Sequence, residues 1–263
     1  MANPEPLDHV VAGAGPGLVL IHGTGADATS NWGALIDATR DRYTVVAPNL
    51  PGAGATPVDP APIDLDSLAD RVVATARTAG LERFHLVGHS VGAVVATAVA
   101  ARHPAAVTSL VLHAGWVRTT PREAFMFDLW ARLLRTDPAL LARQLILTAM
   151  GPGLLGALDD AQFAELAAGF TAVLDERILG QMELDTRVDL RDAVGRIAAP
   201  TLVLASADDQ VIPPHHQREL AAAIQQADYL QVPGGHGLPF EDPARFFSVI
   251  AEYVDRRQAQ GRG

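Results

Sequence analysis

A serine held between two glycines is the first chemical signal in this chain. The segment Gly88-His-Ser-Val-Gly92 follows a short apolar run and opens a helical stretch. In a strand–turn–helix setting, a G-x-S-x-G pattern holds the serine in a strained backbone conformation that projects its oxygen from the turn. Glycine is needed two residues to either side because a larger side chain would collide with neighbouring backbone. The pattern predicts that Ser90 is a nucleophile.

A serine nucleophile needs a base and a group that orients the base, because its hydroxyl is otherwise a poor nucleophile. Three of the nine histidines follow both Ser90 and the long helical stretch described below: His215, His216 and His236. The first two come directly after a pair of prolines and are expected to begin a helix with exposed side chains. His236 lies in the glycine loop after the last predicted strand, and we predict that it is the base.

The orienting acid is one of two neighbouring aspartates, Asp208 and Asp209. Here the sequence resembles the α/β-hydrolase superfamily, in particular its serine-nucleophile branch of esterase-like and lactonase-like members with a helical cap. In that family the chain order is serine, acid, histidine, and the acid lies four residues before a proline. Asp209-Gln-Val-Ile-Pro213 fits this register, so the resemblance implies that Asp209 orients His236 and that Asp208 is a turn or helix-capping residue.

The oxyanion of a tetrahedral intermediate must be held by preorganised donors. One is expected to be the backbone N–H of Val91, directly after the nucleophile. The resemblance implies a second donor in His22-Gly-Thr-Gly25, the loop after the first apolar run, namely the backbone N–H of Thr24. This chemistry implies no metal ion and no organic cofactor.

Two residues depart from the commonest family pattern without changing the catalytic residues, and two other positions argue against particular reactions of the family. The segment from Asn49 to Thr56 reads Asn-Leu-Pro-Gly-Ala-Gly-Ala-Thr where D-x-x-G-x-G-x-S is usual, which keeps polar groups but removes a charge. Ser90 argues against epoxide hydrolases and haloalkane dehalogenases, which carry aspartate at this position. Residues 23–32 loosely resemble the oxyanion loop of hydrolases that cleave carbon–carbon bonds, but Gly237 stands where those enzymes commonly have tryptophan.

Short apolar runs bounded by glycine or proline predict strands buried on both faces, as in parallel sheets. They cover residues 18–21, 43–47, 84–87, 109–113, 201–205 and 229–232. Helical patterns lie between them, one capped by Asp64 or Asp66 and ending near Gly80, and another over residues 91–101. The alternation predicts an α/β fold, a doubly wound and mostly parallel sheet.

Helical patterns alone fill the middle of the chain, over residues 125–135, 139–150 and 161–174. We therefore expect an α/β-hydrolase core of residues 1–115 and 196–263, interrupted by a helical cap of residues 116–195, which is too long for an ordinary loop. The cap should cover the carboxyl ends of the strands, where ligands bind in open α/β sheets.

Large apolar residues of the predicted cap are candidates for the pocket lining. They are Phe125, Phe127, Leu129, Trp130, Leu133, Leu134, Met150 and Phe170. Trp32 and Trp116 are expected to flank the pocket mouth. For any one of these residues, packing of the cap onto the core is the favoured alternative. An apolar lining favours a hydrophobic acyl or alcohol group over a sugar or a polyanion.

The composition fits one compact domain of 263 residues with an insertion. A net charge of −10 argues against nucleic acid and membrane surfaces as partners, and the absence of cysteine excludes disulfides and thiolate chemistry. Residues 1–17 do not resemble a secretory signal, and the longest apolar stretch is too short to cross a bilayer. We expect a cytoplasmic protein with a frayed C-terminus from residue 256; the oligomeric state is unknown from sequence.

These features together predict a serine hydrolase that cleaves an ester, lactone or thioester of a small, partly hydrophobic substrate through an acyl-enzyme. The alternatives are a carbon–carbon bond hydrolase of ring-cleavage products, a perhydrolase, and a biosynthetic lyase or cyclase in which Ser90 only donates a hydrogen bond. A non-catalytic ligand receptor is disfavoured because Ser90, Asp209 and His236 are all present.

Overall fold

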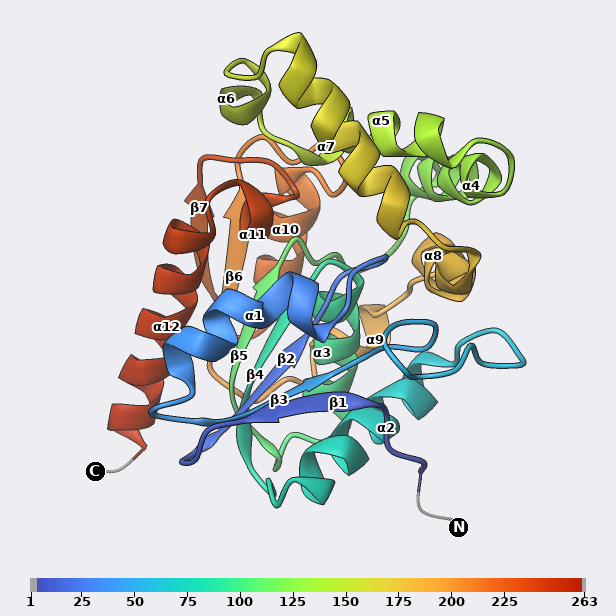
Figure 1. The fold of residues 1–263 in the computed structure, drawn as a ribbon. Helices are drawn as coiled ribbons and strands as arrows, with labels where there is room; N and C mark the ends of the chain where they lie inside the picture. The colour runs from blue at the N-terminus through green and yellow to red at the C-terminus, as the bar shows by residue number, and fades with distance from the viewer. Residues whose placement is uncertain (1–3, 262–263) are drawn as a thin grey trace.

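The computed structural model describes residues 4–261, and a seven-stranded sheet runs through its centre (Figure 1). The strand order is β1-β3-β2-β4-β5-β6-β7, in which β1 pairs antiparallel with β3 and all other pairs are parallel. The strands are β1 (His9–Ala12), β2 (Gly17–Ile21), β3 (Thr44–Pro48), β4 (Phe84–His89), β5 (Val107–His113), β6 (Thr201–Ser206) and β7 (Asp228–Val232). The predicted doubly wound, mostly parallel sheet is confirmed.

Strand β1 is the one strand that the apolar runs did not predict. It lies at the edge of the sheet, and its side chains are half-buried or exposed. Strands β2 and β4 are buried at every position because helices cover both of their faces. A short antiparallel edge strand carries no such continuous apolar signal.

Helices cover both faces of the sheet and form two apolar clusters. On one face, Trp32 stacks on Phe246 with ring centroids 5.9 Å apart. The helices of that face are α1 (Ala28–Thr39) and α12 (Pro243–Gln260), and those of the other are α2 (Leu65–Thr78), α3 (Val91–Arg102) and α10 (Pro214–Ala223). Every residue of α3 from Val91 to Ala101 is buried, so this helix forms the middle of the larger cluster.

The expectation of a frayed C-terminus from residue 256 was wrong for residues 256–260, and residues 262 and 263 lie outside the described part of the chain. Helix α12 continues to Gln260, and its last turns are held by side chains. The Arg257 guanidinium donates to Asp228 of β7 at 3.0 Å, and Gln258 is bonded to the ring of His85 of β4 at 2.9 Å. Polar residues therefore anchor this helix end to the sheet, which composition alone could not reveal. Within residues 4–261, no helix combines the length and apolar character needed to cross a bilayer.

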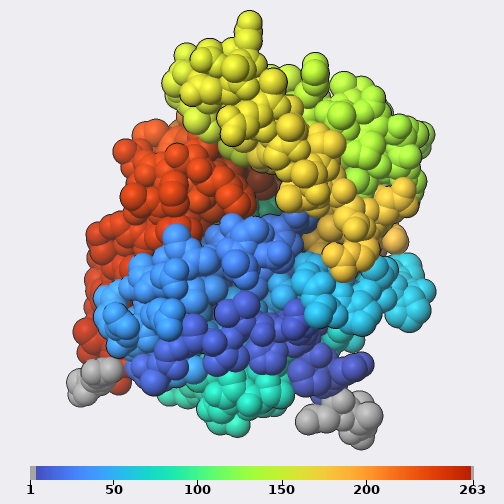
Figure 2. Space-filling model, in the orientation of Figure 1, coloured from blue at the N-terminus to red at the C-terminus, as the bar shows by residue number. Residues whose placement is uncertain are grey.

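Helices alone connect β5 to β6. Most of them lie above the carboxyl ends of the strands in Figure 1, whereas the last lies beside α3. They are α4 (Pro121–Thr136), α5 (Pro138–Ala149), α6 (Pro152–Leu155), α7 (Asp160–Val173), the 3-10 helix η1 (Glu176–Ile178), α8 (Leu179–Thr186) and α9 (Arg191–Val194). An isolated bridge between Arg118 and Asp189 joins the two ends of this segment. Figure 2 shows a hollow between the yellow helices of the segment and the blue and red parts of the sheet domain.

Aspartates and prolines define where several helices begin. The Asp64 side chain accepts from the backbone N–H of Ser67 and caps α2, so Asp64 and not Asp66 is the cap. Pro138 is the first residue of α5, where its missing N–H leaves no hydrogen bond unmade. Asp159 caps α7 in a reciprocal capping box with Gln162.

Candidate active site

Ser90 stands at a tight turn between β4 and α3. Its backbone has φ 55° and ψ −123°, in the left-handed half of conformational space that side chains rarely adopt. A Cβ on Gly88 would lie 2.2 Å from the carbonyl oxygen of Gly92, and a Cβ on Gly92 would lie 2.2 Å from that of Ile21. Both glycines are therefore required for steric reasons, and the turn directs Ser90 to a cavity at the strand ends.

The ring of His236 joins Ser90 to Asp209. Its Nε2 lies 2.9 Å from the Ser90 Oγ, and its Nδ1 lies 2.9 Å from the Asp209 Oδ2. A carboxylate oxygen accepts, so Nδ1 carries the ring proton and Nε2 is left to accept from the serine hydroxyl. All three residues are buried, which removes competing water from this hydrogen-bonded chain.

Asp209 is held by groups of its own loop. Its Oδ1 accepts from the backbone N–H of Val211 and of Ile212 at 2.9 and 2.8 Å. Its Oδ2 also accepts from the Gln217 side chain at 3.3 Å, a contact that the sequence did not indicate. The neighbouring Asp208 is exposed and bonds instead to the backbone of Gly234, through its N–H at 2.9 Å and its side chain at 3.4 Å.

The loop that carries His236 is fixed against the helical segment. The Gly237 N–H donates to the carbonyl of Ala149 at 2.7 Å. A Cβ on Gly237 would lie 2.9 Å from Sδ and Cε of Met150, so Met150 occupies the space that a larger side chain would need. The Gly235 N–H donates to Glu241, whose pKa burial raises. The residue after His236 is therefore small because of its packing against the end of α5.

The loop after β2 lies directly against Ser90. A Cβ on Gly23 would be only 3.2 Å from that of Ser90. The N–H of Gly23 donates to Asn31, and that of Gly25 donates to Gln181 at 3.2 Å. Among residues 4–261, the N–H groups of Thr24 and Val91 donate to no protein acceptor. Neither predicted oxyanion donor therefore has an acceptor among these residues, whereas the backbone N–H groups on either side of Thr24 each donate a hydrogen bond.

His22 connects this loop to the one after β3. Its Nε2 accepts from the backbone N–H of Leu50 at 2.9 Å, so its proton is on Nδ1, which donates to the carbonyl of Gly23. Burial lowers the pKa of His22 to about 4, opposed in part by the Gly23 hydrogen bond. The ring therefore stays neutral and holds the predicted oxyanion loop in place, a role that the sequence did not signal.

Asn49 and Thr56, which depart from the usual family pattern, form hydrogen bonds close to the same loops. The Asn49 amide donates to the Asp8 carboxylate at 2.7 Å and accepts from the N–H of Ala28 at 2.8 Å. An aspartate at residue 49 would place two carboxylates together. The Thr56 hydroxyl donates to the carbonyl of Asn49 at 2.7 Å. The departure from the usual family pattern thus follows from Asp8, which supplies the negative charge.

Ser90 and His236 open into a cavity of about 470 Å³ between the sheet domain and the helical segment. Four predicted lining residues are present, namely Phe127, Trp130, Met150 and Phe170. Phe125 and Leu129 are exposed, so the lining role was wrong for both. Leu133 and Leu134 pack into the apolar cluster, which is the favoured alternative and not the lining role. Lining residues that the sequence analysis missed include Leu145, Leu154, Leu166, Val173, Leu174, Ile178, Met182, Asp185 and Phe240.

The predicted positions of Trp32 and Trp116 at the pocket mouth were wrong as well. Trp32 is fully buried between α1 and α12, and Trp116 packs on Phe127 with centroids 6.0 Å apart. Neither lines the cavity that holds Ser90. Their size made them candidates, but both fill the apolar clusters.

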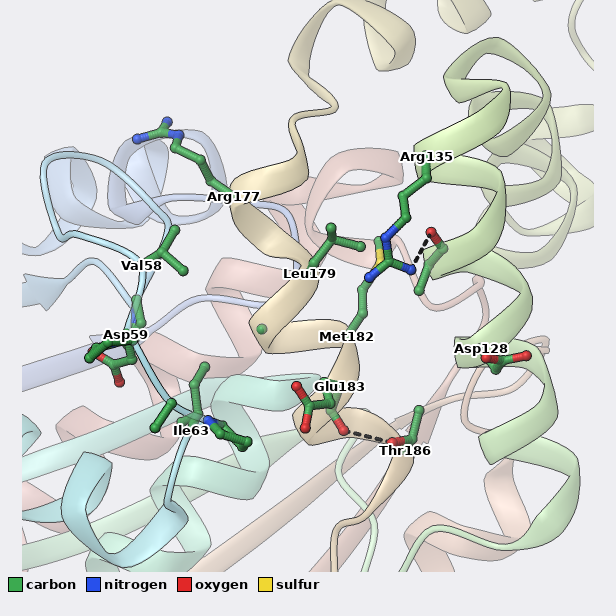
Figure 3. Close-up of a pocket in the computed structure, with 16 residues that line it drawn as sticks. Val58, Asp59, Ile63, Asp128, Arg135, Arg177, Leu179, Met182, Glu183 and Thr186 are labelled. Carbon is green, nitrogen blue, oxygen red and sulfur yellow. Dashed lines mark hydrogen bonds between the residues drawn. The ribbon is translucent and has the colours of Figure 1, made fainter.

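A second cavity, of about 560 Å³, lies beside α8 (Figure 3). It is bounded by α4, α8 and the loop that carries Val58 and Ile63. Met182 borders both cavities. The described lining of this larger cavity contains neither Ser90 nor His236, so the hydrogen-bonded chain belongs to the smaller one.

The prediction that His216 is exposed was wrong, although His215 is indeed exposed. The His216 Nε2 lies 3.2 Å from Glu123 of α4, which is itself fully buried. Thr120 and Arg122 also donate to this carboxylate. The pair joins α10 to the first helix of the inserted segment, and only the three-dimensional contact between the two helices reveals it.

Two further buried histidines lie beside His236. The ring of His89 is 5.2 Å from that of His236 and is bonded to His113 at 2.8 Å, and His113 reaches Ser206 at 3.0 Å. Burial lowers the pKa of both His89 and His113 well below the usual value. Both rings are therefore neutral, and they form a polar support behind the site. No cluster of three or more potential metal ligands occurs among the residues that the structure describes.

Comparisons with known proteins agree with this geometry. A sequence model described as the alpha/beta hydrolase fold matches residues 16–243. The chain is 33% identical to a pyrrolizixenacetamide deacetylase of Xenorhabdus hominickii, with 94% of each chain covered. Among solved structures, a thermophilic esterase from Thermogutta terrifontis shows 25% identity and a TM-score of 0.82, covering 95% of this chain and 93% of that one.

A structure with lower identity shows the same fold. The enol-lactonase from Burkholderia xenovorans LB400 is 22% identical, with a TM-score of 0.83 over 94% of this chain and 96% of that one. The family match and the deacetylase relative each cover most of the chain. The protein is therefore a hydrolase-type enzyme that belongs to the α/β-hydrolase fold family.

Proposed function

We propose that this enzyme is a serine hydrolase that cleaves an acyl bond of a small, partly hydrophobic substrate through an acyl-enzyme. The observation that carries the proposal is the ring of His236, 2.9 Å from both the Ser90 Oγ and the Asp209 Oδ2. We include amides beside esters, lactones and thioesters, because the 33% identical relative is named as the deacetylase of an acetamide.

The mechanism follows from the same three side chains. The Ser90 oxygen attacks the carbonyl carbon while its proton passes to Nε2 of His236, and Asp209 stabilises the resulting imidazolium. The N–H groups of Thr24 and Val91 hold the oxyanion. His236 then protonates the leaving alcohol, thiol or amine. Water, activated by the same ring, releases the acid and restores the Ser90 hydroxyl.

In this proposal the helical segment of residues 116–195 is the cap of the cavity. Its apolar side chains, among them Phe127, Trp130 and Phe170, surround the space in front of Ser90. Burial of a hydrophobic acyl or alcohol group there contributes binding free energy of about 25 cal/mol per Å² of apolar surface. The cap therefore selects the substrate, while the sheet domain carries out the reaction.

The test is turnover of 4-nitrophenyl acetate and butyrate by matched variants. Ser90→Ala and Asp209→Asn should each lower kcat by about 10⁴-fold. Asp208→Asn, one residue away, and His215→Ala, an exposed histidine, should stay within about threefold of the parent. A fluorophosphonate should label Ser90, seen as a mass shift of its peptide. Turnover that survives Ser90→Ala would instead support a proton-transfer enzyme.

A further inference from the structure

The cavity contains a buried acid that the reaction proposed above does not use. Asp185, on α8, is 1% exposed and lines the same space as Ser90 and His236. Its Oδ2 accepts from the hydroxyl of Thr24 at 2.7 Å. Its Oδ1 is buried and has no hydrogen-bond partner among the described residues. An unpaired buried carboxyl oxygen is costly, so its presence in a substrate cavity calls for a ligand group.

The position of Asp185 places this oxygen near the reacting centre. Thr24 follows Gly23, which lies directly against Ser90. The Thr24 N–H is the proposed oxyanion donor, and its hydroxyl reaches Asp185. The hydroxyl of Thr119 donates to the backbone carbonyl of Asp185 at 2.6 Å and fixes the helix position. The free carboxyl oxygen is thus held close to the proposed oxyanion site.

The charges of the cavity decide which ligand group fits. Asp185 is the one Asp, Glu or Arg among the described lining residues, and the other titratable side chains there are His89 and His236. A carboxylate-bearing substrate would meet no cation and would be repelled by an ionised Asp185. A positively charged nitrogen with an N–H would supply both the missing donor and the missing counter-charge.

We propose that Asp185 determines the substrate specificity of this cavity; the proposal rests on the hydrolase function proposed above. Asp185 binds a protonated amine that the substrate carries near its scissile carbonyl. The apolar lining takes the rest of the molecule. The substrate class is therefore an ester or amide with a basic nitrogen within a few bonds of the carbonyl.

Burial raises the pKa of Asp185 to about 8, opposed by the Thr24 hydrogen bond. The empty cavity therefore holds mainly the neutral acid at neutral pH. An ammonium ligand favours the ionised form, so its binding should release a proton from Asp185 to the buffer. Thr24 and Thr119 face Asp185 with hydroxyls only. The other titratable side chains of the described lining are His89 and His236, so no second acid in this lining can release the proton.

The kinetic test uses two esters of equal shape, 2-(dimethylamino)ethyl acetate and 3-methylbutyl acetate. At neutral pH the parent should prefer the amine ester by about tenfold or more in kcat/KM, and Asp185→Asn should remove that preference. The Asn side chain can still accept from Thr24, so a merely structural role would leave the ratio unchanged. Glu183→Gln, on the same helix but lining the other cavity, should keep the parent ratio.

The binding test needs no turnover. Calorimetry of hexylamine in buffers of different ionisation enthalpy should show proton release with the parent and none with Asp185→Asn, and hexan-1-ol and hexanoate should bind more weakly. Equal kcat/KM for the two esters, or absence of proton release from the parent, would overturn the inference while leaving the hydrolase proposal intact. Conversely, if Ser90→Ala retains turnover, the hydrolase proposal fails and calorimetry still decides the role of Asp185.

Discussion

Helices α3 and α7 are both rich in small and apolar residues, yet their surroundings are opposite. In α3 every residue from Val91 to Ala101 is buried, whereas α7 has no buried residue. Instead, Leu166, Phe170 and Val173 of α7 line the cavity that holds Ser90. The apolar side chains of α3 pack in the core, while those of α7 line one side of the cavity. The same composition therefore serves a rigid support in one region and a binding surface in the other.

The two regions also differ in how they treat buried polar groups. In α3 the hydroxyl of Thr97 donates to the carbonyl of Ala93 at 2.7 Å. In α8, which follows α7, Asp185 keeps one oxygen unpaired. Because an unpaired buried group lowers stability, α8 retains a feature that α3 lacks. We expect substitutions in α3 to act on stability and substitutions around the cavity to act on substrate choice.

The largest effect is expected for Gly92→Ala in α3. The new Cβ would lie 2.2 Å and 2.5 Å from the carbonyl oxygens of Ile21, the last residue of β2, and of His22, which follows it. These backbone atoms cannot move aside easily. We expect a loss of about 3 kcal/mol or more in the free energy of unfolding, measured by denaturant titration. An unfolding midpoint equal to that of the parent would show that α3 is less constrained than its burial indicates.

Asp185→Asn should stabilise the protein by an amount that depends on pH. The pKa of Asp185 is about 8 in the folded state and 3.8, its ordinary value, when unfolded. Below pH 4 both states hold the proton; as the pH rises, only the unfolded state ionises, so the parent loses stability relative to the Asn variant up to about pH 8. We expect a gain of about 1–3 kcal/mol near pH 8.

The check on this sign is the same pair of proteins near pH 4. The gain should be smaller there, because Asp185 is neutral in the folded parent and is only partly ionised in the unfolded parent, whose pKa is 3.8. Thermal denaturation of the two proteins across this range isolates the residue, since other titrations cancel in the difference. A constant difference between pH 4 and pH 8 would contradict a neutral buried acid.

Phe170→Ala should change substrate preference more than stability. The ring is half-buried on α7 and lines the cavity. We expect kcat/KM for 4-nitrophenyl hexanoate to fall by about tenfold, and that for the acetate to change little, because only the longer chain reaches the wall. Phe163→Ala is the matched control, since Phe163 lies on the same helix outside the cavity lining. Equal losses with both esters would show that Phe170 supports the fold.

The smallest effect is expected for Gly169→Ala, the counterpart of the substitution in α3. A Cβ on Gly169 would meet no atom within 4 Å. Alanine in the interior of a helix is favoured over glycine, so the free energy of unfolding should rise by about 0.5–1 kcal/mol. Chemical denaturation of this variant beside Gly92→Ala compares the two helices with one and the same substitution, and a loss of stability at Gly169 would mean that α7 is tightly packed.

Much of the fold and of the candidate site was predictable because it depends on local sequence patterns. The buried parallel strands appear as continuous apolar runs, and the turn at Ser90 appears as two glycines with fixed spacing. The choice of Asp209 over Asp208 came from a family register, and in the structure it is the Asp209 side chain that contacts His236. By contrast, β1 escaped notice because an exposed edge strand has no such run.

The errors share one cause, which is that residue type and local position do not tell where a side chain points. Trp32 and Trp116 were expected at the pocket mouth, and His216 was expected to be exposed because it begins a helix after two prolines. The first two fill the apolar clusters, and the third meets a buried glutamate of another helix. Asp185 gave no signal at all, because its meaning depends on the loop of Thr24 that α8 happens to contact.

The sequence by itself determined the class of fold and the turn that presents Ser90, because each depends on a short pattern with a steric or periodic reason; the acid followed from a family register. Only the tertiary structure decided which apolar residues face the cavity, that His22 holds the loop of Thr24, and that Asp185 lines the same cavity as Ser90. These depend on how helices joined by long stretches of chain pack together, and no local pattern encodes that contact.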